Sequence, residues 1–190
     1  DYIESAIIKL KEQDPTLKIS VGDITKLKFP SNYFKYVLAF GLYHNLNNNL
    51  DEAILETNRV LEKNGFICAS FRADNIQTRI VDFLTYKKEK KLSNKSPQEF
   101  HKLNLNKKEF SELFSSKGFE VLSIEPVVNM PLLYKFKFFR HSSQKIFNEA
   151  IGRVDGYRLS YLGSIFQKLL MYFFRLQFCN LYILIAKKIN

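Results

Sequence analysis

The chain has 190 residues, a mass of 22.4 kDa and 46% hydrophobic residues, which fits one domain of ordinary size with a sizeable core. With 7 glycines and 5 prolines, this composition excludes disordered, collagen-like and low-complexity proteins. A count of 29 basic and 19 acidic residues gives a net charge of +10, which points to a negatively charged partner. Most of the basic residues are scattered lysines, and this pattern favours a solvated surface over a dedicated phosphate site.

The two cysteines, Cys68 and Cys179, lie far apart within apolar runs. This excludes a disulfide framework and a cysteine-rich metal site, and it predicts a reduced, cytoplasmic setting. No metal site is expected at the histidines either, since His101 and His141 have no partner at a metal-ligand spacing. The longest apolar region, residues 161–186, is interrupted by Gln167, Lys168, Arg175 and Gln177, so no transmembrane segment is predicted.

Short apolar runs alternate with helical patterns along the first two thirds of the chain, which is the rhythm of βαβ units. A helix is expected over residues 5–11, ending at Asp14-Pro15. Further helices are expected over 50–61, 75–84 and 105–116, and strands over 17–21, 36–40, 66–71, 119–124 and 181–188.

Residues 131–177 differ from the rest of the chain because they are rich in aromatic and basic residues and then become amphipathic. No internal repeat or clean linker separates them from their surroundings. We therefore predict one domain, residues 1–190. Its parts are a core over 1–130, an inserted helical cap or substrate region over 131–177, and a final strand over 178–190.

Four short patterns follow one another in order. The first three are an acid before the first helix, a Gly-Asp turn after a strand, and a His-Asn pair after a strand, whereas the fourth is an architectural helix-to-strand turn. Their residues are Asp1, Val21 to Ile24, Phe34 to Asn45, and Asn58 to Gly65. Ligands of open α/β sheets bind at the carboxyl ends of strands, so the first three patterns predict a binding site there.

In this order the patterns resemble class I S-adenosylmethionine-dependent methyltransferases, of the type that includes quinone-biosynthesis and other small-molecule enzymes. The matching residues are Gly22-Asp23, Leu27 to Pro30, Phe34-Lys35, His44-Asn45 and Arg59 to Gly65. The resemblance is close over residues 1–75 and looser beyond. It implies an α/β fold with a Rossmann-like sheet that is mostly parallel and has an antiparallel C-terminal strand. It also implies S-adenosylmethionine as the cofactor.

By that resemblance, Asp1 would hold the ribose hydroxyls and Tyr2 would flank the adenine. Asp23 would bind the adenine amino group and Ile24 the adenine face. A further cofactor contact, at the end of the family's fourth strand, would fall on Phe40 and Gly41.

His44 is the candidate general base, because it follows a strand that borders the expected site and titrates near neutrality. Tyr43 is a candidate for assisting deprotonation or for stacking on the acceptor. The alternative for both is a structural role, because methyl transfer often needs only proximity and alignment. Two residues differ from the family pattern: Lys35 stands where the family usually has Asp, and Asn45 stands where a second His often lies. These differences leave the acceptor site less defined than the cofactor site.

The family's glycine-rich turn and its first strand have no counterpart in this sequence, whose seven glycines form no GxGxG-like motif. The family's sheet order resembles 3-2-1-4-5-7-6, so strands 1 and 2 would lie between the strands expected at 17–21 and 36–40. We therefore expect these residues to be the downstream part of a longer protein in which strands 1 and 2 precede them.

The predicted function is methyl transfer from S-adenosylmethionine to a small-molecule or lipid-like acceptor. The alternative is a non-catalytic module of the same fold that binds RNA or an anionic surface through its basic face. For the basic and aromatic stretch 134–140, three roles stay open: nucleic-acid binding, peripheral membrane contact, or a cap packed over the substrate. The sequence does not define the oligomeric state.

Overall fold

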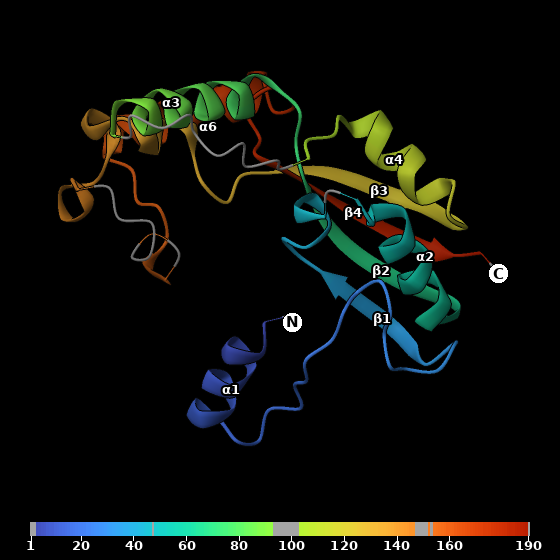
Figure 1. Cartoon of the computed structure of the whole chain (residues 1–190). Coiled ribbons are helices and arrows are strands. Elements are labelled where there is room, and N and C mark those ends of the chain that lie inside the picture. The colour runs from blue at the N-terminus through green and yellow to red at the C-terminus, as the bar shows by residue number, and fades with distance from the viewer. Residues whose placement is uncertain (1–2, 47, 93–102, 147–151, 153, 190) are drawn as a thin grey trace.

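A computed structural model of the chain describes residues 3–46, 48–92, 103–146, 152 and 154–189. Within these residues the strands are β1 (Phe34–Ala39), β2 (Leu61–Arg72), β3 (Phe119–Val127) and β4 (Leu181–Lys188). They form one sheet in the order β1-β2-β4-β3 (Figure 1). β1 is parallel to β2, and β4 is antiparallel to both β2 and β3. Three strands thus share one direction and the last is reversed, which confirms the predicted fold class and matches the 4-5-7-6 part of the expected order.

The α-helices are α1 (Glu4–Gln13), α2 (Leu50–Val60), α3 (Ile76–Leu92), α4 (Lys107–Ser115) and α6 (Tyr161–Phe173). Short 3-10 helices are η1 (Tyr43–Asn45), η2 (Leu132–Lys135), η3 (Lys137–Phe139) and η4 (Ser142–Gln144). In Figure 1, α2 and α4 lie along the sheet, whereas α3 and α6 lie beyond the end at which β2 leads into α3. These positions confirm the predicted helices. Most boundaries shift by a few residues, but α3 extends eight residues beyond the expected end at Leu84.

The core lies where α2 and α4 cover the sheet. α4 begins with a capping box between Asn106 and Glu109, which satisfies backbone N–H groups at the helix start. Its buried Phe110 and Phe114 continue a chain of aromatic rings from Phe71 on β2 to Phe119 on β3, with centroids 5.4 to 5.5 Å apart. This aromatic packing fixes α4 against the sheet.

Asn64 and Gly65 lie within β2, where its pairing with β1 shifts register. Asn64 has a φ of 63°, the left-handed conformation that Asn tolerates better than most residues. A Cβ on Gly65 would lie 2.9 Å from the carbonyl oxygen of Glu62 and 3.0 Å from that of Lys35. Only glycine therefore permits this close approach of β2 to β1.

The strand expected over residues 17–21 does not form, and that prediction is wrong for this structure. The segment makes a local turn instead, in which the Ile19 N–H donates to the Leu17 carbonyl at 3.0 Å. A strand is stabilised by a paired neighbour, and the described residues contain no strand that pairs with this segment. β1 is correspondingly an edge strand, on which Tyr36 and Leu38 are exposed.

The cap segment, residues 131–177, lies between β3 and β4 in the chain. Arg140 joins its parts, because the guanidinium donates to the carbonyls of Tyr134 at 2.7 Å, Lys135 at 2.9 Å and Lys145 at 3.0 Å. It also lies over the Tyr134 ring, 5.3 Å from the centroid. Within the described ranges, no helix is both long and apolar enough to cross a membrane.

Candidate functional site

The turn at Asp23 lines a cavity of about 780 Å³ beside the carboxyl end of β1. The Asp23 Oδ1 atom accepts hydrogen bonds from the backbone N–H and the hydroxyl of Thr25, both at 2.8 Å. These bonds lower the pKa of the exposed carboxyl group, so it is ionised at neutral pH. Its second oxygen, Oδ2, makes no hydrogen bond to another described residue, which leaves one carboxylate oxygen available to a ligand.

Two side chains of α2 hold the loop that carries this turn. The Glu56 Oε1 atom accepts from the Leu27 N–H at 2.7 Å. Arg59 donates to the carbonyls of Leu27 at 3.1 Å and Phe29 at 2.9 Å, and it pairs with Glu56 at 2.7 Å. The hydrogen bond from Arg59 is the main cause that lowers the Glu56 pKa. The loop position is therefore set by an ion pair that is itself anchored to the core through α2.

The sequence reasoning missed this role of Glu56 and Arg59. It assigned Arg59 to an architectural turn and did not single out Glu56. The signal that could have found the pair is their i,i+3 spacing on a predicted helix, which places both side chains on the same face.

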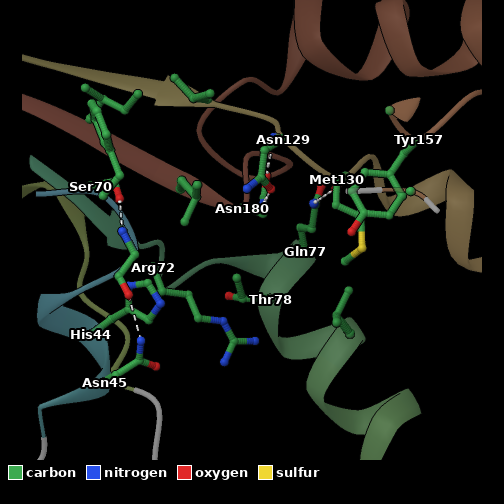
Figure 2. A pocket seen from close by; sticks show the side chains of 18 residues that line it. His44, Asn45, Ser70, Arg72, Gln77, Thr78, Asn129, Met130, Tyr157 and Asn180 are labelled. Carbon is green, nitrogen blue, oxygen red and sulfur yellow. Dashed lines mark hydrogen bonds between the residues drawn. The ribbon is translucent and has the colours of Figure 1, made fainter. Parts of the chain in front are cut away.

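A second cavity, of about 860 Å³, lies between the end of the sheet and the cap. Figure 2 shows polar side chains from η1, β2 and α3 pointing toward it, with Tyr157 of the cap on the far side. Arg72 is the one Lys, Arg, Asp or Glu among the described residues that line it, and it pairs with Asp82. The lining is otherwise neutral and partly apolar, and Asp82, which does not line the cavity, balances the charge of Arg72.

Gln77 adds a polar group to this second cavity. Its side chain is fully buried, and its Nε2 atom donates to the Met130 carbonyl at 3.1 Å. Its Oε1 atom has no hydrogen-bond partner among the described residues. A buried acceptor of this kind is costly to leave unpaired, so it favours a ligand that donates a hydrogen bond there.

The strand end that separates the two cavities has a fixed backbone. Gly41 has a φ of 69°, its N–H donates to the Ser70 hydroxyl at 2.9 Å, and its carbonyl accepts from the Asn45 amide at 2.7 Å (Figure 2). Phe40 and Asn45 line both cavities. The two cavities therefore adjoin at these two side chains.

The structure places the expected cofactor residues at both cavities. Asp23, Ile24 and Phe40 line the first cavity together. Gly41 lines the second cavity instead, and its backbone groups are already occupied by Ser70 and Asn45. The expected ribose and adenine contacts at residues 1 and 2 lie outside the described residues.

Tyr43 is part of the core, and the expected contact with the acceptor does not fit this position. Its side chain is fully buried, and its hydroxyl lies 2.8 Å from the Thr57 hydroxyl. Burial raises the pKa of this phenol to about 12, so it stays protonated at neutral pH. Neither cavity is lined by Tyr43.

His44 lies beside Tyr43 on η1 but faces the second cavity. It is half-buried, and its ring contacts Phe71 edge to face with centroids 6.1 Å apart. Its carbonyl accepts from the Leu103 N–H at 3.0 Å. His44 therefore stays the candidate base, because it lines a cavity that Tyr43 does not line.

Residues 1–69 match the family described as "methyltransferase domain". Among solved structures, a SAM-dependent methyltransferase from Archaeoglobus fulgidus is 18% identical, with a TM-score of 0.59, 99% of this chain covered and 74% of that chain. One from Methanosarcina mazei is 12% identical, with a TM-score of 0.59 and coverages of 99% and 79%. The matched residues are a little over a third of the chain, and the solved structures show that the chain has the fold of SAM-dependent methyltransferases.

Another solved structure shows that this fold also carries other chemistry. The (4+2)-cyclase SpnF is 17% identical to this chain, with a TM-score of 0.53 and 97% of the chain covered. The chain spans 60% of the length of that cyclase. No curated protein sequence matches the chain.

The cofactor of the methyltransferase family is S-adenosylmethionine, and the first cavity fits it. Its volume lies within the roughly 300–1,000 Å³ typical of small-molecule sites. Asp23 offers a carboxylate oxygen that can accept a hydrogen bond from an amino or hydroxyl group, and Ile24 and Phe40 offer apolar surface for a flat ring. Within the described ranges, no cluster of three or more His, Cys, Asp or Glu side chains could hold a metal ion.

Proposed function

We propose that the protein transfers the methyl group of S-adenosylmethionine to a small or lipid-like acceptor. The observation that carries the proposal is the pair of cavities that adjoin at Phe40 and Asn45. A group-transfer enzyme needs a donor site and an acceptor site in contact, because the reacting atoms must approach to about 3–3.5 Å.

The first cavity would hold the donor. Asp23 would accept a hydrogen bond from the adenine amino group, and Ile24 and Phe40 would pack on the adenine. When bound, S-adenosylmethionine supplies an electrophilic methyl group. The protein's part is to bind it in one orientation, and the Glu56–Arg59 pair serves this by fixing the loop of Asp23.

The second cavity would hold the acceptor. Arg72 favours an acceptor with an acidic or electron-rich group, since it is the only charged lining residue among those described. The Gln77 Oε1 atom would accept a hydrogen bond from a hydroxyl or amine of the acceptor. His44 would take the proton that the acceptor atom loses during transfer.

The experiment is a calorimetric titration with S-adenosylmethionine and S-adenosylhomocysteine, followed by an assay for released S-adenosylhomocysteine. The assay would use pooled phenols, amines and carboxylate-bearing aromatic compounds as acceptors. We expect both ligands to bind with one site per chain, and release that depends on an added acceptor. Absence of binding to either ligand would contradict the proposal.

A different outcome would separate donor binding from methyl transfer. Binding without release for any acceptor pool would favour a protein that keeps the cofactor site but not the reaction. A solved structure of similar fold is a (4+2)-cyclase, so a different reaction is known on a chain of this fold.

A further inference from the structure

Helix α6 exposes its apolar side. Six apolar residues lie within an arc of about 120° of the helix, counted at 100° per residue. Their exposed fractions range from 39% for Ile165 to 82% for Tyr172. The residues of this α6 face are Leu162, Ile165, Phe166, Leu169, Tyr172 and Phe173.

The buried residues on the side of α6 that faces the protein are small or polar, with Leu170 and Met171 half-buried beside them. Gly163 and Gln167 are buried there, and a Cβ on Gly163 would lie 2.6 Å from the carbonyl oxygen of Phe139. α6 is therefore seated by a close backbone contact with η3. This seating turns the apolar face outward, the reverse of the arrangement found in most surface helices.

The surroundings of the α6 face are basic. Segments 131–146 and 156–178 contain seven lysines and arginines and no Asp or Glu, although the exposed Asp155 precedes the second segment and Arg175 pairs with Glu125 at 3.3 Å. Lys168 is exposed at the edge of the α6 face. On η3, Lys137 is exposed beside Phe138, whose side chain is 74% exposed. An exposed apolar and aromatic face with cations around it has the composition of an interfacial helix.

We propose that the α6 face docks onto a membrane surface that contains anionic phospholipids. The apolar side chains would enter the boundary between headgroups and acyl chains, and Lys137 and Lys168 would lie among the headgroups. Charge complementarity favours an anionic membrane over a second copy of the chain as the partner of the α6 face. Two copies would bring two predominantly basic surfaces against each other, and each chain carries a net charge of +10.

The test is cosedimentation with vesicles of phosphatidylcholine alone and of phosphatidylcholine mixed with phosphatidylglycerol. We expect binding to the mixed vesicles, weak binding to the neutral vesicles, and a decrease as salt is raised. The double variant Leu169→Ser, Phe173→Ser should lower the partition coefficient on the order of tenfold. Lys168→Glu should lower it by a similar factor for the mixed vesicles only.

Matched controls change equally exposed residues elsewhere. Ile8→Ser with Leu55→Ser removes apolar groups that are 52% and 50% exposed on α1 and α2, and Lys9→Glu reverses an exposed charge on α1. These controls should bind the mixed vesicles like the wild type. If the double variant fails to fold, the binding of Lys168→Glu to the mixed vesicles still tests the proposal.

Two results would overturn the proposal. One is a wild type that does not bind the mixed vesicles, or that binds them equally well when the α6 face is changed. The other is a dimer in light scattering that Leu169→Ser, Phe173→Ser converts to a monomer, because the face would then be an interface between copies.

Discussion

Asp23 shows how a turn prepares a carboxylate for binding. Thr25 occupies Oδ1 with two hydrogen bonds and so fixes the direction of the side chain, while Oδ2 remains available. Asp14 forms the same kind of turn with Thr16, with bonds of 3.0 and 2.6 Å, but it lines neither of the two large cavities. The turn alone is therefore not the signal for a site, and the cavity beside Asp23 makes the difference.

Tyr43 and His44 are adjacent in sequence but serve different purposes. Thr57 donates its hydroxyl to the Ala53 carbonyl at 2.8 Å, so the Tyr43 hydroxyl donates to Thr57. We expect Tyr43→Phe to lower the free energy of unfolding by about 1 kcal/mol, the contribution of a typical buried hydrogen bond. The measurement is urea denaturation followed by circular dichroism.

The same Tyr43→Phe variant should bind S-adenosylhomocysteine like the wild type. A loss of binding or of methyl transfer with unchanged stability would instead place the Tyr43 hydroxyl in the reaction. The sequence could not separate the two neighbours, since both follow a predicted strand. The structure does, because η1 turns one side chain into the core and the other toward a cavity.

At the scale of elements, α2 connects the core to the loop of the first cavity. Glu56→Gln would keep an acceptor for the Leu27 N–H but remove the charge that pairs with Arg59. We expect S-adenosylhomocysteine affinity to fall about threefold to tenfold in calorimetry, because the loop would be held less firmly. Glu52→Gln is the matched control, since Glu52 is an exposed residue of the same helix.

The Glu56–Arg59 pair also predicts a pH dependence. The folded-state pKa of Glu56 is lowered from its ordinary value of 4.5, so its stabilising effect is fully present above that value. The effect is lost as the pH falls through the lowered pKa. The difference in unfolding free energy between wild type and Glu56→Gln should therefore be constant near neutrality and shrink on acidification below pH 4.5. A difference that grows on acidification would contradict the assignment.

The helices and most strands were predictable from local patterns, because apolar spacing and terminal residues act over short distances. Asn64 is an exception, because β2 already begins at Leu61 and Asn64 adopts its left-handed conformation within that strand rather than in the expected helix-to-strand turn. The segment at 17–21 is a second exception. Its composition suits a strand, but a strand forms only beside a partner, and partner strands are set by the whole sheet rather than by the segment.

At the scale of the whole molecule, the proposed function depends on two cavities built from opposite parts of the chain. The first uses the Asp23 loop and β1, and the second uses the end of the sheet and the cap. Phe40 and Asn45, at the end of β1, belong to both. The sequence indicated the first cavity through the resemblance of its motifs. The roles of Arg72 and Gln77 in the second cavity were not predictable, because the cavity exists only where cap residues such as Tyr157 lie opposite them.

The positions of the basic residues show which part of the molecule carries the net charge of +10. Of the lysines and arginines described, Arg72 alone lines either cavity, whereas seven basic residues belong to the cap segments. The excess charge therefore bears on the surface of the cap more than on the proposed reaction.

The most direct test of the account is the affinity for S-adenosylhomocysteine of two matched variants, Asp23→Asn and Asp14→Asn, measured by calorimetry. Asparagine can keep either turn, so only the carboxylate charge is lost. We predict that Asp23→Asn weakens binding about tenfold, the difference between a charged and a neutral hydrogen bond, and that Asp14→Asn binds like the wild type. Equal affinities for the two variants would contradict the assignment of the donor to the Asp23 cavity.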